Sequence, residues 1–305
     1  MEIILKILSD SLYFTAPILL VTLGGLFAYK ANVVNIGLEG MMLFGGLFAA
    51  ITLFYTKSWL LAGIVTMIGG ILIGLLFAYF GVSRKANFII TGFAINLLAI
   101  AIGKYVQALM QVTAINVVGI IPVKLLRIDL GFIGDIPILG PIINNHSILT
   151  YLSFVLIGVA SFVLYKTKLG TYIRVVGESE EAAKSIGIKI NYIKYIAIII
   201  GGILTAFAGY EVAINQLSSY TPDITAGTGF IAIAAIYCGN GKPKTAALYA
   251  IIFGLARSLS VNLALHVGNI ARLLEIIPYI MIVLVLTVVA IIRHRKTLYR
   301  GFINE

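Results

Sequence analysis

Long apolar runs make up most of this sequence, and they restrict the possible folds more than any other feature. The hydrocarbon core of a bilayer is about 30 Å thick and is crossed by about 20 residues of apolar helix. Nine runs are candidates for such helices. They lie at about residues 11–29, 34–54, 59–80, 88–110, 147–165, 193–214, 226–239, 245–262 and 273–292. We therefore expect an all-α fold, a polytopic transmembrane helical bundle of about nine spans (eight to ten) in one domain over residues 1–305.

The seventh run is shorter than the others. Its 14 residues, 226–239, rise only about 21 Å as a helix, which is less than the hydrocarbon thickness. It ends at a helix-breaking segment, Gly239-Asn240-Gly241-Lys242-Pro243. Irregular backbone at membrane depth is tolerated only where protein buries it or a cavity lies beside it. The sequence therefore predicts a broken or re-entrant segment here.

Composition and charge agree with this fold class. Only 11% of the residues are charged, whereas soluble proteins contain about 25%, so a soluble enzyme, a disordered regulator and a coiled coil are excluded. The net charge of +10 would indicate nucleic-acid binding in a soluble protein, but membrane topology explains it, and no nucleic acid is expected. With an external N-terminus, 15 of the 22 basic residues lie on the cytoplasmic side, which predicts a multi-pass protein of the plasma or inner membrane with a cytoplasmic C-terminus.

Two loops between the runs are long, an external one over about 111–146 and a cytoplasmic one over about 166–192. The second contains a predicted short amphipathic helix, which Ser179 can cap and Gly187 can end. Its first turn carries Glu180 and Glu181, and its expected apolar face carries Ala182, Ala183 and Ile186. From these residues alone, the helix is either a solvated surface helix or a docking helix for a cytoplasmic partner.

Polar side chains inside membrane spans are costly, so each is a candidate functional residue. Asn35 and Glu39 lie four residues apart on one face of the second run, where a glycine-rich helix start could hold a carboxylate. The alternative is that a buried Glu39 bonds neighbouring backbone and fixes local structure. In the sixth run Glu211 is followed four residues later by Asn215, and Arg257 in the eighth run is a candidate partner for Glu211.

The fourth run carries a polar stripe close to one helical face. Its members are Asn96, Lys104, Gln107 and Gln111. Such a stripe indicates either a water-lined path or hydrogen bonding between helices.

Catalytic and metal-binding patterns are absent from the sequence. The single cysteine, Cys238, excludes an internal disulfide and a cysteine-based metal site, and the three histidines show no metal-binding spacing. The sequence around Lys242 lacks the first glycine and the Ser/Thr of a phosphate loop. We therefore expect a chain that is not an enzyme, binds no metal and cannot hydrolyse ATP by itself.

Four blocks of sequence, in this order, are similar to motifs of one transport family. They are VNIGLEGMM at 34–42, TGFAINLLA at 91–99, KLG, RVVGE, EAA and GI within 168–188, and AGTGFIAIAA at 226–235. The chain resembles the permease subunits of bacterial ABC importers for ribose, other simple sugars and nucleosides, a group that includes the branched-chain amino-acid permeases. Within this family it looks most like the shorter of the two permeases of nucleoside importers.

The resemblance implies a function and a set of partners. The chain would form the pathway for nucleosides delivered by an extracellular or periplasmic substrate-binding protein, together with a second permease subunit, similar or identical, in the lipid bilayer. A cytoplasmic ABC ATPase would supply the energy, so ATP and Mg²⁺ would bind to that partner and no cofactor to this chain. The alternatives are a permease of the same type for ribose or another simple sugar, and a proton-coupled secondary transporter.

The resemblance also implies two groups of site residues. Coupling to the ATPase would involve Gly177, Glu178, Glu181, Ala182, Ala183 and Gly187. The predicted translocation pathway residues are Asn35, Glu39, Asn96 and Gln107.

Overall fold

The computed structural model describes residues 2–120, 127–131, 134, 136, 139–265 and 271–303. Among these residues, seven helices are long and apolar enough to cross a membrane. They are α1 (Glu2–Lys30), α2 (Leu38–Thr56), α3 (Trp59–Ala78), α4 (Phe88–Met110), α7 (Ile148–Lys166), α10 (Ile190–Tyr210) and α12 (Pro243–Ala264). Two of them continue as π-helical turns, η1 (Tyr79–Ser83) after α3 and η3 (Glu211–Gln216) after α10. The predicted fold class, a polytopic helical bundle, is confirmed.

The remaining two predicted runs also form helices. α11 (Thr228–Cys238) has 11 residues, which rise about 16 Å, so the seventh run is a short helix, as predicted. α14 (Ile277–Ile303) contains a shorter apolar stretch, Ile277–Ile292. All nine predicted apolar runs are therefore helical, and seven of the helices reach spanning length.

Short helices and two strand pairs connect the spans. The helices are α6 (Leu139–Ile143), α8 (Lys168–Glu178), α9 (Glu180–Ser185) and α13 (Ala271–Leu274). The antiparallel pairs are β1 (Ile115–Asn116) with β4 (Ser219–Tyr220), and β2 (Arg127–Ile128) with β3 (His146–Ser147). In register, Ile115 is opposite Tyr220 and Arg127 is opposite Ser147.

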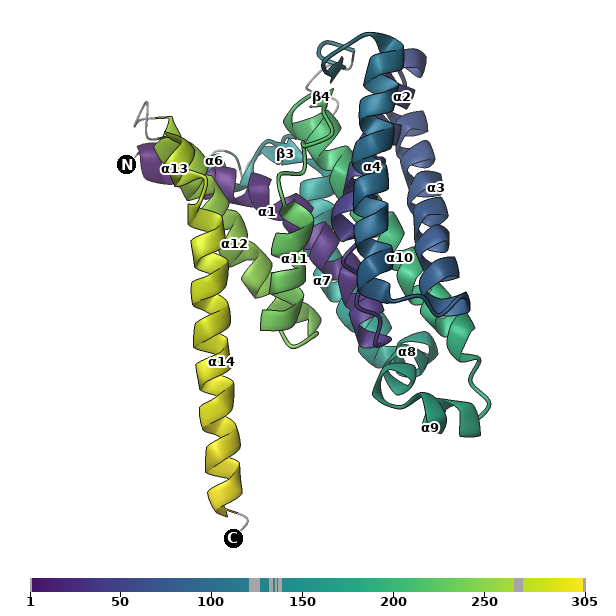
Figure 1. The fold of residues 1–305 in the computed structure, drawn as a ribbon. Helices are drawn as coiled ribbons and strands as arrows, with labels where there is room; N and C mark the ends of the chain where they lie inside the picture. Colours follow the sequence, from purple (N-terminus) through teal and green to yellow (C-terminus); the bar gives the residue numbers. More distant parts are fainter. Residues whose placement is uncertain are drawn as a thin grey trace.

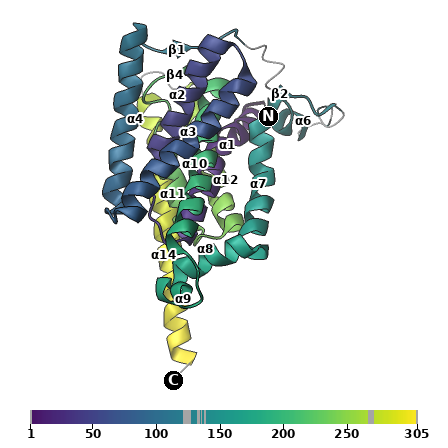
Figure 2. The ribbon, with the colours of Figure 1, turned by 90° about the vertical axis from the view of Figure 1, so that its right-hand side faces the viewer.

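The two ends of the bundle carry different elements (Figures 1 and 2). β1 to β4 lie at one end, here called the strand end, whereas α8, α9 and the C-terminal end of α14 lie at the other, here called the α9 end. The described parts of loop 111–146 and loop 166–192 are therefore at opposite ends. Their assignment to the external and cytoplasmic sides of the membrane stays a prediction.

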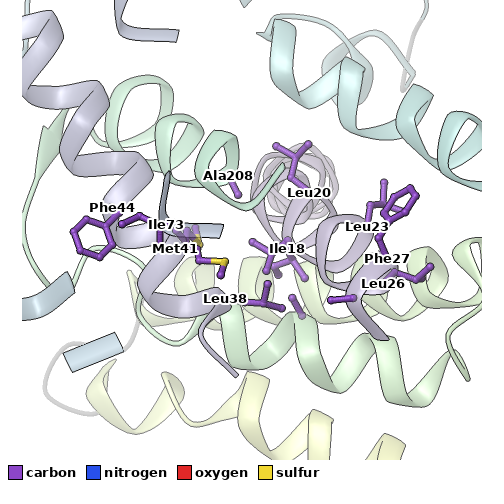
Figure 3. Close-up of a cluster of buried hydrophobic side chains, with 14 of the residues drawn as sticks. Ile18, Leu20, Leu23, Leu26, Phe27, Leu38, Met41, Phe44, Ile73 and Ala208 are labelled. Atoms are coloured by element: carbon purple, nitrogen blue, oxygen red, sulfur yellow. The ribbon is translucent and has the colours of Figure 1, made fainter. Parts of the chain in front are cut away.

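α1 runs through the middle of the bundle, and 83% of its most apolar window is buried. Its side chains Ile18, Leu23 and Phe27 belong to the buried cluster shown in Figure 3. Small residues bring the neighbouring helices close together, because a Cβ placed on Gly70 of α3 would lie 2.7 Å from the carbonyl oxygen of Gly202 in α10. The core is thus built around α1 and α10. It positions the unwound segments between helices that are described next.

Candidate functional site

The chain unwinds between α1 and α2, and Asn35 lies in this break. Its Oδ1 accepts a hydrogen bond from the backbone N–H of Gly37 at 2.9 Å, which closes a turn just before α2 begins at Leu38. The expectation that Asn35 and Glu39 share a helical face is therefore wrong. The physical reason is that the asparagine side chain bonds its own backbone two residues on and delays the start of the helix.

Asn96 reaches the same break from α4. Its Oδ1 accepts a hydrogen bond from the backbone N–H of Gly40 at 2.7 Å, and its Nδ2 donates to the carbonyl oxygen of Ile36 at 3.1 Å. The first N–H groups of a helix have no partner within the helix. Asn96 therefore satisfies one donor of α2 and one carbonyl of the break from a neighbouring span.

Glu39, in the first turn of α2, is buried and holds the N-terminus of α11. Its carboxylate accepts hydrogen bonds from the Thr225 hydroxyl and from the backbone N–H groups of Gly227 and Gly229, the latter two at 2.9 and 2.6 Å. A carboxylate at a helix N-terminus is stabilised by the helix dipole. Glu39 does bond buried backbone, as one interpretation proposed, but this backbone is 188 residues away from it in sequence.

Two further helices hold the same end of α11. Arg257 of α12 donates through Nη1 to the carbonyl oxygen of Ala226 at 3.4 Å and to Thr228 Oγ1 at 3.2 Å. The hydroxyl of Tyr279 in α14 donates to the same carbonyl at 3.1 Å. Ala226 has a left-handed backbone with φ of 43°, which is uncommon outside glycine. The N-terminus of α11 is thus where α2, α12 and α14 converge.

The proposed pairing of Glu211 with Arg257 is wrong. Glu211 lies in η3 at the strand end and is fully buried. Its carboxylate accepts hydrogen bonds from Ser147 Oγ at 2.6 Å, from Thr150 Oγ1 at 3.3 Å and from the Asn215 amide. The N-terminal turn of α7 supplies the two hydroxyls, so this carboxylate is satisfied without an arginine.

Glu211 lines a cavity of about 750 Å³ at the strand end. Tyr13, Asn215 and His146 lie in the same wall. His146 sits in β3, outside the spans, where burial lowers the pKa of its imidazole below the usual value. Polar and apolar side chains both line the cavity, which is separate from the cluster around Glu39.

The predicted stripe on α4 is only partly correct. Asn96 and Gln107 are buried, whereas Lys104 and Gln111 are exposed. Lys104 is eight residues after Asn96, which turns it about 80° away at 100° per residue. Gln111 follows the last helical residue in a left-handed conformation with φ of 53°.

Gln107 belongs to the strand end. Its Nε2 donates to the carbonyl oxygens of Thr113 at 2.8 Å and of Tyr220 at 3.4 Å. It therefore ties α4 to β4. Asn35, Glu39 and Asn96 each bond or stand at the break and the first turn of α2, and we call these three residues the break cluster. Gln107 lies about 16 Å along α4 from Asn96.

The predicted short amphipathic helix is observed as α9. Ser179 caps it, because its Oγ accepts from the backbone N–H of Ala182 at 3.2 Å, and Gly187 follows it with φ of +79°. Lys194 of α10 forms an ion pair with Glu180. Glu181 is exposed on the first turn.

The expected apolar face of α9 is divided by the fold. Ala183 is fully buried against this chain, whereas Ala182 and Ile186 are exposed. The six-residue helix is anchored through Ala183 and the Glu180–Lys194 ion pair, and its other side is open. The preceding helix, α8, is anchored too, because a Cβ on Gly177 would overlap the carbonyl oxygen of Lys30 at the end of α1. α8 is therefore fastened to the helix that leads into the break cluster, and α9 is fastened to α10.

Sequence reasoning missed several members of these sites. Thr225, Tyr279 and Ser147 were not singled out, although each bonds a key group. Thr225 stands in a TAGTG sequence, whose small polar residues before an apolar helix are a helix-start signal. Nothing local in the sequence distinguishes Tyr279 from the other tyrosines.

The chain also resembles known proteins along almost its whole length. A model of the family described as branched-chain amino acid transport system / permease component matches residues 7–286. The chain belongs to this family.

Two individual relatives are similar over nearly the same range, and a third over a shorter stretch. The chain is 33% identical over 299 residues to the guanosine ABC transporter permease protein NupQ of Bacillus subtilis (strain 168), which covers 94% of this chain and 92% of that protein. It is 30% identical over 296 residues to the nucleoside ABC transporter permease protein NupC of Lactococcus lactis subsp. cremoris (strain MG1363), with 92% and 90% covered. A stretch of 83 residues is 41% identical to the ribose import permease protein RbsC of Escherichia coli (strain K12), with 27% and 25% covered.

In this permease-family chain, the break cluster lies where two helices are joined. It joins the start of α2 to the N-terminus of α11, and α8 is packed at the other end of the unwound segment. Within the described residues there is no group of His, Cys, Asp and Glu that could hold a metal ion.

Proposed function

We propose that this chain is the transmembrane permease subunit of an ATP-driven importer and forms the pathway for nucleosides. The observation that carries the proposal is its similarity, over more than 90% of its length, to permeases named for guanosine and nucleosides. ATP and Mg²⁺ bind to a partner ATPase in this proposal, and the chain needs no cofactor of its own. A second permease subunit and an external substrate-binding protein complete the importer.

The α9 end is the proposed cytoplasmic side, and α9 is the proposed contact with the ATPase. The exposure of Glu181, Ala182 and Ile186 supports this assignment, because these side chains are available to a partner. The burial of Ala183 and the close approach of Gly177 to α1 support it as well. A helix that is rigidly fastened to a span can transmit the movement of a partner to that span.

The proposed pathway passes the N-terminal end of α11 and includes Asn35, Glu39, Asn96 and Gln107. In support, α11 is too short to cross the bilayer and ends beside an unwound segment. Discontinuous helices at membrane depth are characteristic of transport sites. Because Asn35, Glu39 and Asn96 already bond buried backbone, we assign them the role of holding the wall of the pathway in shape. The binding protein then supplies most of the selectivity.

Uptake measurements test this function. The chain would be expressed with its partner subunits in cells that lack nucleoside uptake, and labelled guanosine and ribose would be offered separately. We expect guanosine uptake that stops when ATP is depleted and that excess ribose does not inhibit. Uptake of ribose or glucose alone would make the chain a sugar permease. Uptake that an uncoupler abolishes while ATP depletion leaves it intact would make it a secondary transporter.

A further inference from the structure

A second cavity, of about 460 Å³, lies at the α9 end of the bundle. Its walls come from the end of α1, the end of α7, α8 and the last turn of α11. Its volume falls within the range of about 300–1,000 Å³ that is typical of small-molecule sites. The cavity adjoins the joint between Gly177 and Lys30 and is distinct from the break cluster and from the cavity beside Glu211.

Two cations line this cavity without an acidic partner in contact. They are Lys30 and Arg174, and the acid in the same wall is Glu178. Among the described residues the one ion pair is Lys194 with Glu180, so neither cation is paired with Glu178. Lys242 adds a third positive charge near Lys30, because the adjacent Gly241 lies against the Lys30 side chain.

Arg174 has unused hydrogen-bonding capacity. Its Nη2 makes one long hydrogen bond, 3.5 Å, to Thr171 Oγ1, and its Nε is buried without a hydrogen-bond partner among the described residues. The guanidinium lies over the ring of Tyr165, 5.1 Å from the centroid. A guanidinium held in place by stacking, with donors unpaired, suits a bidentate oxyanion such as phosphate.

Three tyrosines of the cavity indicate its depth in the membrane. Tyr29, Tyr165 and Tyr237 all line it. Tyrosine is enriched at the level of the lipid headgroups, where one end of the ring is apolar and the other wet. The cytoplasmic leaflet is anionic, and basic pockets between spans on that side bind lipid headgroups.

We propose that this cavity binds the phosphate of an anionic lipid headgroup, with Arg174 and Lys30 as its ligands. Glu178 accepts hydrogen bonds, so it favours a headgroup that carries hydroxyl donors, such as the glycerol of phosphatidylglycerol. A lipid bound there bridges α1, α7 and α8 and steadies the joint through which α9 is fastened to the spans. The inference uses the proposed orientation of the α9 end, but it does not require that the substrate be a nucleoside.

Native mass spectrometry of the purified full chain tests the proposal by counting retained lipids at a limiting lipid concentration. We expect retention of phosphatidylglycerol in preference to phosphatidylcholine. Arg174→Gln and Lys30→Gln should each lower that retention about fivefold, since one basic residue contributes about 1 kcal/mol near an anionic leaflet. Lys85→Gln is the matched control, because Lys85 is an exposed basic residue that does not line the cavity.

Several results would overturn the proposal. One such result is that the original chain, Arg174→Gln and Lys30→Gln all retain phosphatidylglycerol equally. If one of the two variants is unstable, the other still tests the proposal. Displacement of the lipid by inorganic phosphate or ATP at comparable concentrations would assign the cavity to a free anion. Displacement by the ATPase subunit would assign it to that protein interface. Because binding is measured directly, a failure here leaves the uptake experiment unaffected, and the reverse also holds.

Discussion

Replacing Glu39 with glutamine removes the carboxylate that holds the N-terminus of α11. Glu39 accepts from three donors, the hydroxyl of Thr225 and the N–H groups of Gly227 and Gly229. In glutamine one of the two oxygens becomes an NH₂ group, which cannot accept. At least one buried donor then lacks an acceptor, which costs about 1–3 kcal/mol. The loss of negative charge at the helix N-terminus adds about 0.3–1 kcal/mol.

The expected loss of about 2 kcal/mol in the attachment of α11 can be measured through Cys238. This cysteine lies at the end of α11 and is 4% exposed, so a thiol reagent reaches it only when the helix moves away. If α11 opens as one local unit, its open population rises with the lost free energy. A loss of about 2 kcal/mol corresponds to about 30-fold faster labelling.

The assay compares initial labelling rates of the purified chain with those of Glu39→Gln. Glu181→Gln is the control, because Glu181 is exposed on α9 and the substitution should leave the rate unchanged. A folded Glu39→Gln protein whose Cys238 is labelled within twofold of the original rate would mean that other contacts hold α11.

Three further predictions follow from the same geometry. Ala183→Leu should lower the melting temperature and abolish uptake, because overpacking a buried site costs about 1–3 kcal/mol. Ala182 is exposed, so Ala182→Leu should leave the melting temperature unchanged and reduce uptake only through the partner contact. Gly187→Asp should abolish uptake with normal membrane insertion, because φ of +79° is strained for a side chain by about 1–2 kcal/mol; normal uptake would remove Gly187 from the coupling element. The free energy of unfolding should decrease as the pH falls below about 6.5. The pKa of His146 is lower in the folded chain than in the unfolded chain, so the unfolded chain binds the proton more tightly. Melting curves at pH 7.5 and 5.5 should therefore differ more for the original chain than for His146→Gln, and equal differences would contradict this.

The nine helical segments were predictable because each depends on a local property. A run of apolar residues must be helical in lipid, whatever its neighbours are, since its backbone groups have no other partners there. The short length of α11 and its end before Pro243 follow from counting residues and from a helix-breaking sequence. Ser179 at the start of α9 was predictable for the same reason, because a cap bonds backbone three residues away.

The bonding of the polar residues was less predictable. Asn35 was placed on a helix because spacing alone does not show where a helix starts. The stripe on α4 divided because Lys104, eight residues after Asn96, points about 80° away from it, whereas Gln107, eleven residues after Asn96, points only about 20° away. Arg257 was assigned to Glu211 on charge alone, and the structure directs it to the backbone of residue 226 instead.

The order of residues is enough to specify a membrane-spanning helical bundle with one short helix, a capped surface helix and a family-specific set of motifs. The packing of the helices is needed to show that Glu39 holds α11, that Ala183 is buried while Ala182 is exposed, and that Arg174 and Lys30 share a cavity. Helix formation and capping depend on contacts within about four residues. The bonds of Glu39 join groups up to 190 residues apart, and they exist only because the spans pack against one another in one particular arrangement.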